Sequence, residues 1–152
     1  MRVFANLDDL CACVGQEITV SDWVMVDQDR INAFAHATGD HQWIHVDEDR
    51  AGQGPFGSTI AHGFLTLSML PLFLDQSLRI ERLGMSINYG LNKVRFTSPV
   101  PVGSRLRVRL SLVSCEPIEG GGKQILMQAL FEKEGSDKPV CIAETITRRY
   151  PA

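Results

Sequence analysis

The second half of the chain alternates hydrophobic and polar residues in the pattern of β-strands. In residues 105–113 every second position, from Leu106 to Leu112, is leucine or valine, and the positions between them are mostly arginine. A period of two places the apolar side chains on one face of a strand and leaves the other face to solvent. Clusters of glycine and proline separate the apolar segments and indicate turns. The pattern predicts strands over residues 85–92, 93–97, 105–113, 124–133 and 140–150, with a bulge near Gly90.

The first half of the chain is predicted to be mostly helical. Asp27 is placed to cap a helix whose apolar face begins at Ile31 and ends at Thr38, because the apolar residues recur at helical spacing. The other elements predicted in this half are a helix over residues 7–14 capped by Asn6, a strand over residues 19–26 and one helical turn over residues 47–51.

The most hydrophobic segment, residues 61–74, predicts a helix that is apolar on nearly every side. Such a helix must be surrounded by other elements, and Pro71 is expected to kink or end it near Leu70. With one early strand and a later run of antiparallel strands, the simplest way to bury it is a curved sheet wrapped around it. The predicted fold is therefore a single α+β domain over residues 1–152 with hot-dog architecture.

Composition excludes several kinds of partner. Of the 152 residues, 44% are hydrophobic and 22% charged, and the net charge of −3 provides no basic field for nucleic acid or an anionic membrane. The apolar run over residues 64–74 is about half the roughly 20 residues that span a bilayer. The four cysteines, at positions 11, 13, 115 and 141, have no zinc-ligand spacing and are expected to be free thiols. With no apolar export signal at the N-terminus, the expected location is the cytoplasm.

Candidate chemistry is concentrated between Thr38 and Gly63. Asp40 and His45 offer a carboxylate and an imidazole five residues apart, which suits acid/base chemistry near neutral pH. Gly63 stands at the start of the apolar helix, where unpaired backbone N–H groups point towards any developing negative charge.

These residues resemble the MaoC-like family of (R)-specific enoyl-CoA hydratases, which have the hot-dog fold. The segment Thr38 to His45 keeps the Gly, Asp, aliphatic and His positions of the family pattern, and Ala61-His62-Gly63 keeps its helix head. Gln42 stands where many members have Asn, and Trp43 where they have Pro, as in a branch often called nodulation protein N-like.

The resemblance implies reversible syn addition of water to a trans-2-enoyl thioester. Asp40 and His45 would hold the water, and the Gly63 N–H would bind the enolate oxygen. Gln42, Ser58 and His62 are the candidate substrate contacts, although His62 can instead shape the pocket at the helix entry and Ser58 can hydrogen-bond the loop. The resemblance implies no metal or redox cofactor, coenzyme A or acyl carrier protein as part of the substrate, and a homodimer.

Other interpretations remain open at this stage. Asp40 can be a turn residue, and His41 with His45 can ligate a metal, although no third ligand is evident. A thioesterase would use a carboxylate to activate water, and a binding domain would keep the acyl tunnel without turnover. The arginines and lysine of the late strands can contact coenzyme A phosphates or belong to solvated strand faces: Lys93, Arg95, Arg148 and Arg149.

Overall fold

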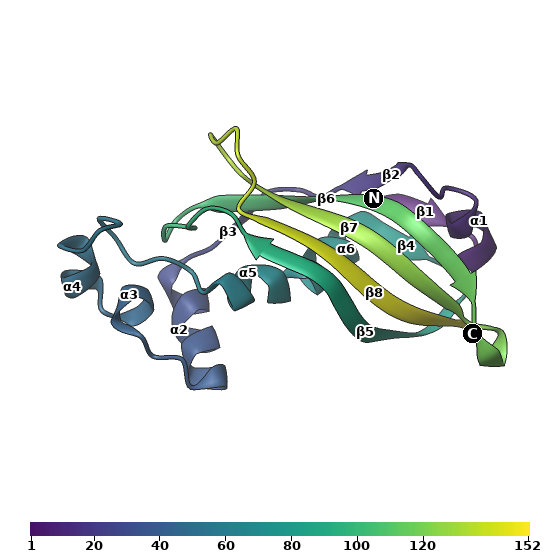
Figure 1. Cartoon of the computed structure of the whole chain (residues 1–152), viewed down its shortest axis with the longest axis horizontal. Helices are drawn as coiled ribbons and strands as arrows, with labels where there is room; N and C mark the ends of the chain where they lie inside the picture. The colour runs from purple at the N-terminus through teal and green to yellow at the C-terminus, as the bar shows by residue number, and fades with distance from the viewer.

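A long antiparallel sheet curves over a kinked helix in the computed structural model, which describes residues 1–152 (Figure 1). The strands of the main sheet run in the order β2-β6-β7-β8-β5, and β3 also pairs with β6. The elements are β1 (Arg2–Phe4), α1 (Leu7–Cys11), β2 (Glu17–Val20), β3 (Val24–Met25), α2 (Gln28–Thr38), α3 (Trp43–Val46), α4 (Glu48–Gly52), α5 (Gly63–Ser68), α6 (Leu70–Ser77), β4 (Leu78–Ile80), β5 (Leu83–Phe96), β6 (Arg105–Pro117), the 3₁₀ turn η1 (Glu119–Gly121), β7 (Lys123–Lys133) and β8 (Cys141–Pro151).

The alternating segments form the core as predicted. The inward residues of β6, from Leu106 to Leu112, are buried, and so are the alternate residues of β7 from Ile125 to Phe131. In β5 the register shifts between Asn88 and Gly90, which confirms the bulge expected near Gly90. The hot-dog architecture of a sheet wrapped around a helix is confirmed.

The central helix is broken in the middle. α5 ends at Ser68 and α6 begins at Leu70, with Pro71 in the first turn of α6, so the predicted kink is confirmed. The helix continues past Leu74 to Ser77. The expectation that nearly every side is buried is wrong for Phe64, which is 68% exposed.

Several short elements differ from the prediction. The strand expected over residues 19–26 is divided into β2 and β3, because residues 21–23 leave the strand conformation between the two segments that pair with β6. The sequence pattern missed β1 and β4, which pair in parallel, and the four-residue helix α3. Such short elements depend on tertiary partners rather than on their own periodicity.

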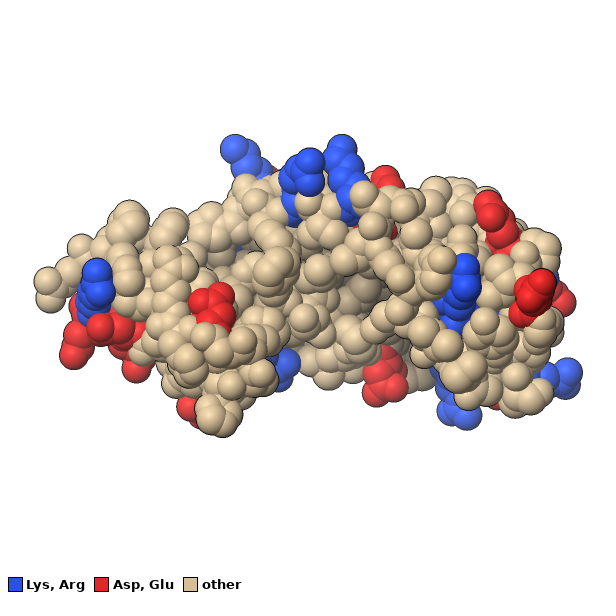
Figure 2. Space-filling view, turned by 60° about the horizontal axis from the view of Figure 1, so that its bottom comes forward, with Lys and Arg blue, Asp and Glu red and all other residues tan.

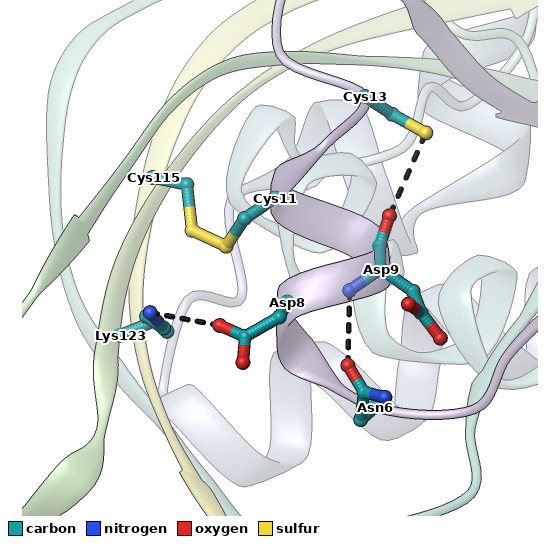
Figure 3. Close-up of a disulfide and its surroundings, with 7 residues drawn as sticks. All are labelled: Asn6, Asp8, Asp9, Cys11, Cys13, Cys115 and Lys123. Atoms are coloured by element: carbon teal, nitrogen blue, oxygen red, sulfur yellow. Dashed lines mark hydrogen bonds and ion pairs between the residues drawn. A yellow bond between two sulfur atoms is a disulfide. The ribbon is translucent and has the colours of Figure 1, made fainter.

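The expectation of four free thiols is wrong for one pair. Cys11 of α1 and Cys115 of β6 form a disulfide with 5.5 Å between their Cα atoms (Figure 3). Cys13 and Cys141 are free. Beside it, Lys123 makes an ion pair of 2.9 Å with Asp8 (Figure 3). The disulfide and the ion pair both join α1 to the sheet.

The edge strand β5 is exposed and carries apolar side chains. One side of β5 pairs with β8, and no strand pairs with the other. Its exposed large residues are Met85, Ile87, Tyr89, Leu91 and Phe96. When the lower side of Figure 1 is turned towards the viewer, the middle of the face is hollowed and almost free of charge, with charged residues gathered at its margins (Figure 2).

None of the helices has both the length and the apolar character that a membrane span requires.

Candidate active site

The loop that carries Asp40 starts where α2 ends. Gly39 adopts the left-handed conformation, with φ of 78°, and its N–H donates to the Ala35 carbonyl. Such a positive φ favours glycine, because other residues meet a steric penalty there. Asp40 follows directly, with its side chain exposed, and Gln42 N–H lies 3.4 Å from its Oδ1. The end of α2 therefore places the Asp40 carboxylate next to α3.

His45 lies on α3 and is only 7% exposed. Its Nδ1 lies 2.7 Å from the backbone carbonyl oxygen of Ile60, which can only accept a hydrogen bond. This contact assigns the proton of a neutral imidazole to Nδ1 and leaves a lone pair on Nε2. On the other side, Gln28 Nε2 donates to the His45 carbonyl at 2.8 Å. His45 is held as a potential base at Nε2.

His62, just before α5, is 2% exposed and packs against His45. The two imidazoles stack with 3.8 Å between ring centroids, and the Phe34 ring lies 5.0 Å from that of His62. His62 Nε2 donates to the backbone carbonyl of Asp40 at 3.0 Å. His62 thus links the Asp40 loop, the His45 ring and the head of the central helix.

Burial lowers the pKa of His62 below its ordinary value of 6.5, and the nearby His45 adds to this effect, while the hydrogen bond to the Asp40 carbonyl opposes it. The neutral form is therefore favoured. With Nε2 donating to Asp40, the Nδ1 atom of His62 is a buried acceptor without a partner.

A cavity of about 380 Å³ opens beside these residues at the head of α5. Gly63 borders it closely: a Cβ built on this residue would lie 2.8 Å from the Phe96 ring. Because only hydrogen stands there, a ligand can approach the backbone N–H of Gly63. The lining residues are His45, Phe56, Ile60, Ala61, Gly63, Thr66, Phe96, Thr97, Ser98, Pro99, Val100 and Val140.

Thr66 is a site residue that sequence reasoning missed. Its Oγ1 is buried without a hydrogen-bond partner, and the residue lines the cavity one turn after Gly63. A threonine inside an apolar helix carries no motif of its own. Its spacing from Gly63, i and i+3, was the available signal, because that spacing puts both on one face.

Asp40, His45 and His62 converge, with one potential ligand atom of each within 4.8 Å of the others. A carboxylate oxygen and an imidazole nitrogen at such a separation can both reach one water molecule, since each hydrogen bond is about 2.8 Å long. One carboxylate and two imidazoles also suit a transition metal. His41, the metal ligand considered from the sequence, is not part of this cluster.

The other candidate residues lie apart from the cavity. Gln42 is exposed at the start of α3, and Ser58 Oγ donates to the Thr59 carbonyl at 3.0 Å. Gln42, Ser58 and Asp40 are all outside the cavity lining.

Comparison with known proteins decides the family. The model of the MaoC like domain matches residues 10–133. The chain belongs to the MaoC-like family. Among its curated MaoC-like relatives, 3-hydroxyacyl-thioester dehydratase Z of Mycobacterium tuberculosis is 53% identical over 97% of this chain and 98% of its own. Nodulation protein N of Rhizobium leguminosarum bv. viciae is 43% identical over 93% of this chain and 89% of its own.

A solved structure agrees with the MaoC-like fold. R-hydratase PhaJ1 of Pseudomonas aeruginosa superposes with a TM-score of 0.70, over 91% of this chain and 83% of its own, at 23% identity. The similarity to nodulation protein N also supports the branch indicated by Gln42 and Trp43.

Proposed function

We propose that the chain is a 3-hydroxyacyl-thioester dehydratase, which reversibly adds water to a trans-2-enoyl thioester to form the (R)-3-hydroxyacyl thioester. The observation that carries the proposal is the convergence of Asp40 with His45, which lines a largely apolar cavity at the head of the central helix. A relative 53% identical over nearly the whole chain bears the name of this activity.

In the hydration direction, His45 Nε2 takes a proton from a water that the Asp40 carboxylate orients. The hydroxide oxygen bonds to the β-carbon, the carbon–carbon π electrons move towards the thioester, and negative charge develops on its oxygen. The proton held by His45 then passes to the α-carbon on the same face, so that one water is added in the syn sense. His45 suits this role because its Nδ1–H donates to the Ile60 carbonyl, which leaves Nε2 free to accept the proton.

The Gly63 N–H is assigned to the enolate oxygen. The first amides of a helix have no acceptor within the helix, and they favour negative charge. A donor placed in advance at the developing charge stabilises the transition state without reorganisation. The proposed reaction involves no electron exchange with the protein and therefore needs no redox cofactor, and in this proposal the Gly63 N–H stabilises the charge that a Lewis-acid metal would otherwise stabilise.

The remaining candidates are assigned by their positions. His62 positions the site through its bond to the Asp40 carbonyl and its stacking on His45. Gln42 and Ser58 remain proposed substrate contacts outside the cavity, where the coenzyme A or acyl carrier protein part of the thioester would lie.

The same proposal includes a homodimer formed through β5. Its unpaired edge and its exposed apolar side chains are unfavourable in an isolated chain. Pairing two copies of β5 would extend one sheet across both chains and cover these residues.

A single assay tests the reaction against two alternatives. The purified protein is incubated with crotonyl-CoA while enoyl absorbance and free thiol are followed together. Loss of absorbance without thiol release supports the dehydratase. Thiol release would instead identify a thioesterase, and binding with no change in either signal would indicate an acyl-thioester-binding domain.

A further inference from the structure

A second cavity of about 380 Å³ lies further along the central helix. Its walls come from α5 and α6, from the bulged part of β5 and from the concave face of the sheet. The residues that line it are Leu67, Ser68, Leu70, Pro71, Leu74, Asn88, Tyr89, Gly90, Leu91, Leu110, Met127, Thr145, Ile146, Thr147 and Arg149. No acidic residue is among them.

Arg149 is the unusual member of this lining. Of the two alternatives that the sequence leaves open for it, contact with coenzyme A phosphates or a solvated strand face, the second is wrong, because the residue is only 5% exposed. Its Nε is buried without a hydrogen-bond partner, and the guanidinium takes part in no ion pair. By contrast, the arginines of β6 all pair with glutamates on the outer face: Arg105, Arg107 and Arg109.

A buried cation without a counter-ion is costly, so its presence calls for a physical account. Burial alone lowers the pKa of Arg149, to about 10, with no neighbouring carboxylate raising it. The guanidinium still carries its charge at neutral pH. No acidic side chain in the cavity lining balances this charge.

The inward face of β8 becomes polar towards the second cavity. Cys141 and Ala143 are buried next to the catalytic end of the sheet, whereas Thr145, Thr147 and Arg149 line the second cavity. A wall built for a plain hydrocarbon chain would stay apolar to its end.

The two cavities follow the same stripe of the central helix. Gly63 and Thr66 border the first cavity, and Leu67, Leu70 and Leu74 border the second. These positions recur at helical spacing and so lie on one face. At about 1.5 Å per residue, Leu74 lies roughly 16 Å from Gly63 along the helix. An extended acyl chain advances about 1.2 Å per bond, as an extended backbone does. An acyl chain on the order of twelve carbons would therefore span this distance.

We propose that the second cavity binds the far end of an acyl chain that carries a terminal carboxylate, and that Arg149 pairs with this carboxylate. The inference rests on the proposed function, because it adds a second binding contact, at Arg149, for the thioester that the Gly63 N–H is proposed to bind. An ω-carboxyacyl thioester would satisfy Arg149 through paired N–H···O bonds while its methylene groups contact the leucines.

Kinetics with matched substrates test the pairing. Hydration of trans-2-dodecenoyl-CoA is compared with that of the mono-CoA thioester of trans-2-dodecenedioic acid. We expect kcat/KM to favour the carboxylate-bearing substrate by roughly 10- to 100-fold, as for a hydrogen bond to a charged group. Arg149→Gln should abolish this preference, and Arg149→Lys should keep part of it. Equal kcat/KM values in the wild type, or an unchanged preference in Arg149→Gln, would overturn the proposal.

Arg105→Gln is the control. Arg105 lies at the start of β6, where its guanidinium pairs with Glu134 at 3.0 Å, and it is not part of the cavity lining. The variant removes the same charge outside the cavity, so we expect the preference to stay. If Arg105→Gln removed it equally, general electrostatics rather than Arg149 would explain the preference.

Binding of free acids separates this proposal from the proposed function, because it needs no turnover. Calorimetry should detect dodecanedioate binding to the wild type more tightly than dodecanoate, and this difference should disappear in Arg149→Gln. The outcome holds even for a protein that hydrates nothing. If the folded protein bound neither acid, the proposal would fail. Arg149→Gln is expected to fold, because it relieves the desolvation of an unpaired cation.

Discussion

At the scale of single residues, the candidate site depends on which ring nitrogen of each histidine is already used. His45 Nδ1–H donates a hydrogen bond to the Ile60 carbonyl, and His62 Nε2–H donates one to the Asp40 carbonyl. The first contact leaves the Nε2 lone pair of His45 free to accept a proton. The second ties the backbone of the same aspartate to the helix head. Both contacts use backbone carbonyls, so they fix the side chains without adding another charge.

The first prediction concerns Asp40 and His45 together. We expect Asp40→Asn and His45→Gln each to lower kcat for crotonyl-CoA hydration by about 100- to 10,000-fold, the range of general acid–base catalysis. Because both side chains act on one water, the double variant should be little slower than the worse single variant. Single-turnover rates of the three variants measure this. Losses that multiply would contradict a shared water.

The second prediction concerns His62 and pH. Its pKa is lowered in the folded state, so below about pH 6.5 the unfolded chain takes up a proton first. Stability is therefore full above pH 6.5 and is lost as pH falls towards the folded pKa. Urea unfolding at pH 7.5 and pH 5.5 should show this loss in the wild type and a smaller one in His62→Gln.

His36→Gln provides the control for that measurement, because His36 is an exposed histidine on α2. It should keep the wild-type dependence on pH. If His62→Gln kept it as well, burial of His62 would not be the origin of the acid sensitivity.

How much of the site can be predicted depends on how local its signal is. Asp40, His45 and Gly63 stand close together in sequence, in residue types that suit one chemistry, and this made them visible. Arg149 has no such signal, because its burial follows from the direction in which one position of β8 faces. The disulfide was missed for a similar reason, since its cysteines are 104 residues apart.

At the scale of elements, the break between α5 and α6 lies along the stretch of the central helix that borders both cavities. α5 borders the first cavity through Gly63 and Thr66 and the second through Leu67, whereas α6 borders only the second, through Leu70 and Leu74. The break at Met69 was predictable because Pro71 has no backbone N–H to donate a hydrogen bond to the preceding turn. The short elements were not, because β1 and β4 exist through their mutual pairing.

The third prediction tests the helix head. In Gly63→Ala the new methyl group would lie 2.8 Å from the Phe96 ring, so either the ring or a bound thioester must move. If the Gly63 N–H stabilises the enolate, turnover should fall by about 100- to 1000-fold, equivalent to roughly 3 to 4 kcal/mol. Hydration rate and melting temperature are measured on the same sample. Near-normal turnover with a lowered melting temperature would assign Gly63 a packing role only.

Gly52→Ala is the matched control for that variant. A Cβ at Gly52 would meet nothing within 4 Å, and its backbone has no positive φ. It should leave hydration unchanged, so a loss in both variants would point to a general effect of the added methyl group.

At the scale of the whole molecule, strands were easier to predict than their exposure. The alternation in β6 and β7 indicated both the strands and the face that is buried, because one face packs on the core. In β5 almost every residue is exposed, apolar ones included. Sequence pattern cannot reveal this, since it does not tell which strand lies at an edge.

The last prediction follows from that edge. We expect light scattering at micromolar concentration to give twice the 16.9 kDa mass of one chain. Ile87→Glu should shift the mass towards 16.9 kDa, because it places a charge among the exposed apolar residues of β5 that pairing would bury. Val113→Glu, which changes an exposed apolar residue of β6 instead, should leave the dimer intact. A wild-type monomer would remove the claim, and equal dissociation in both variants would move the interface away from β5.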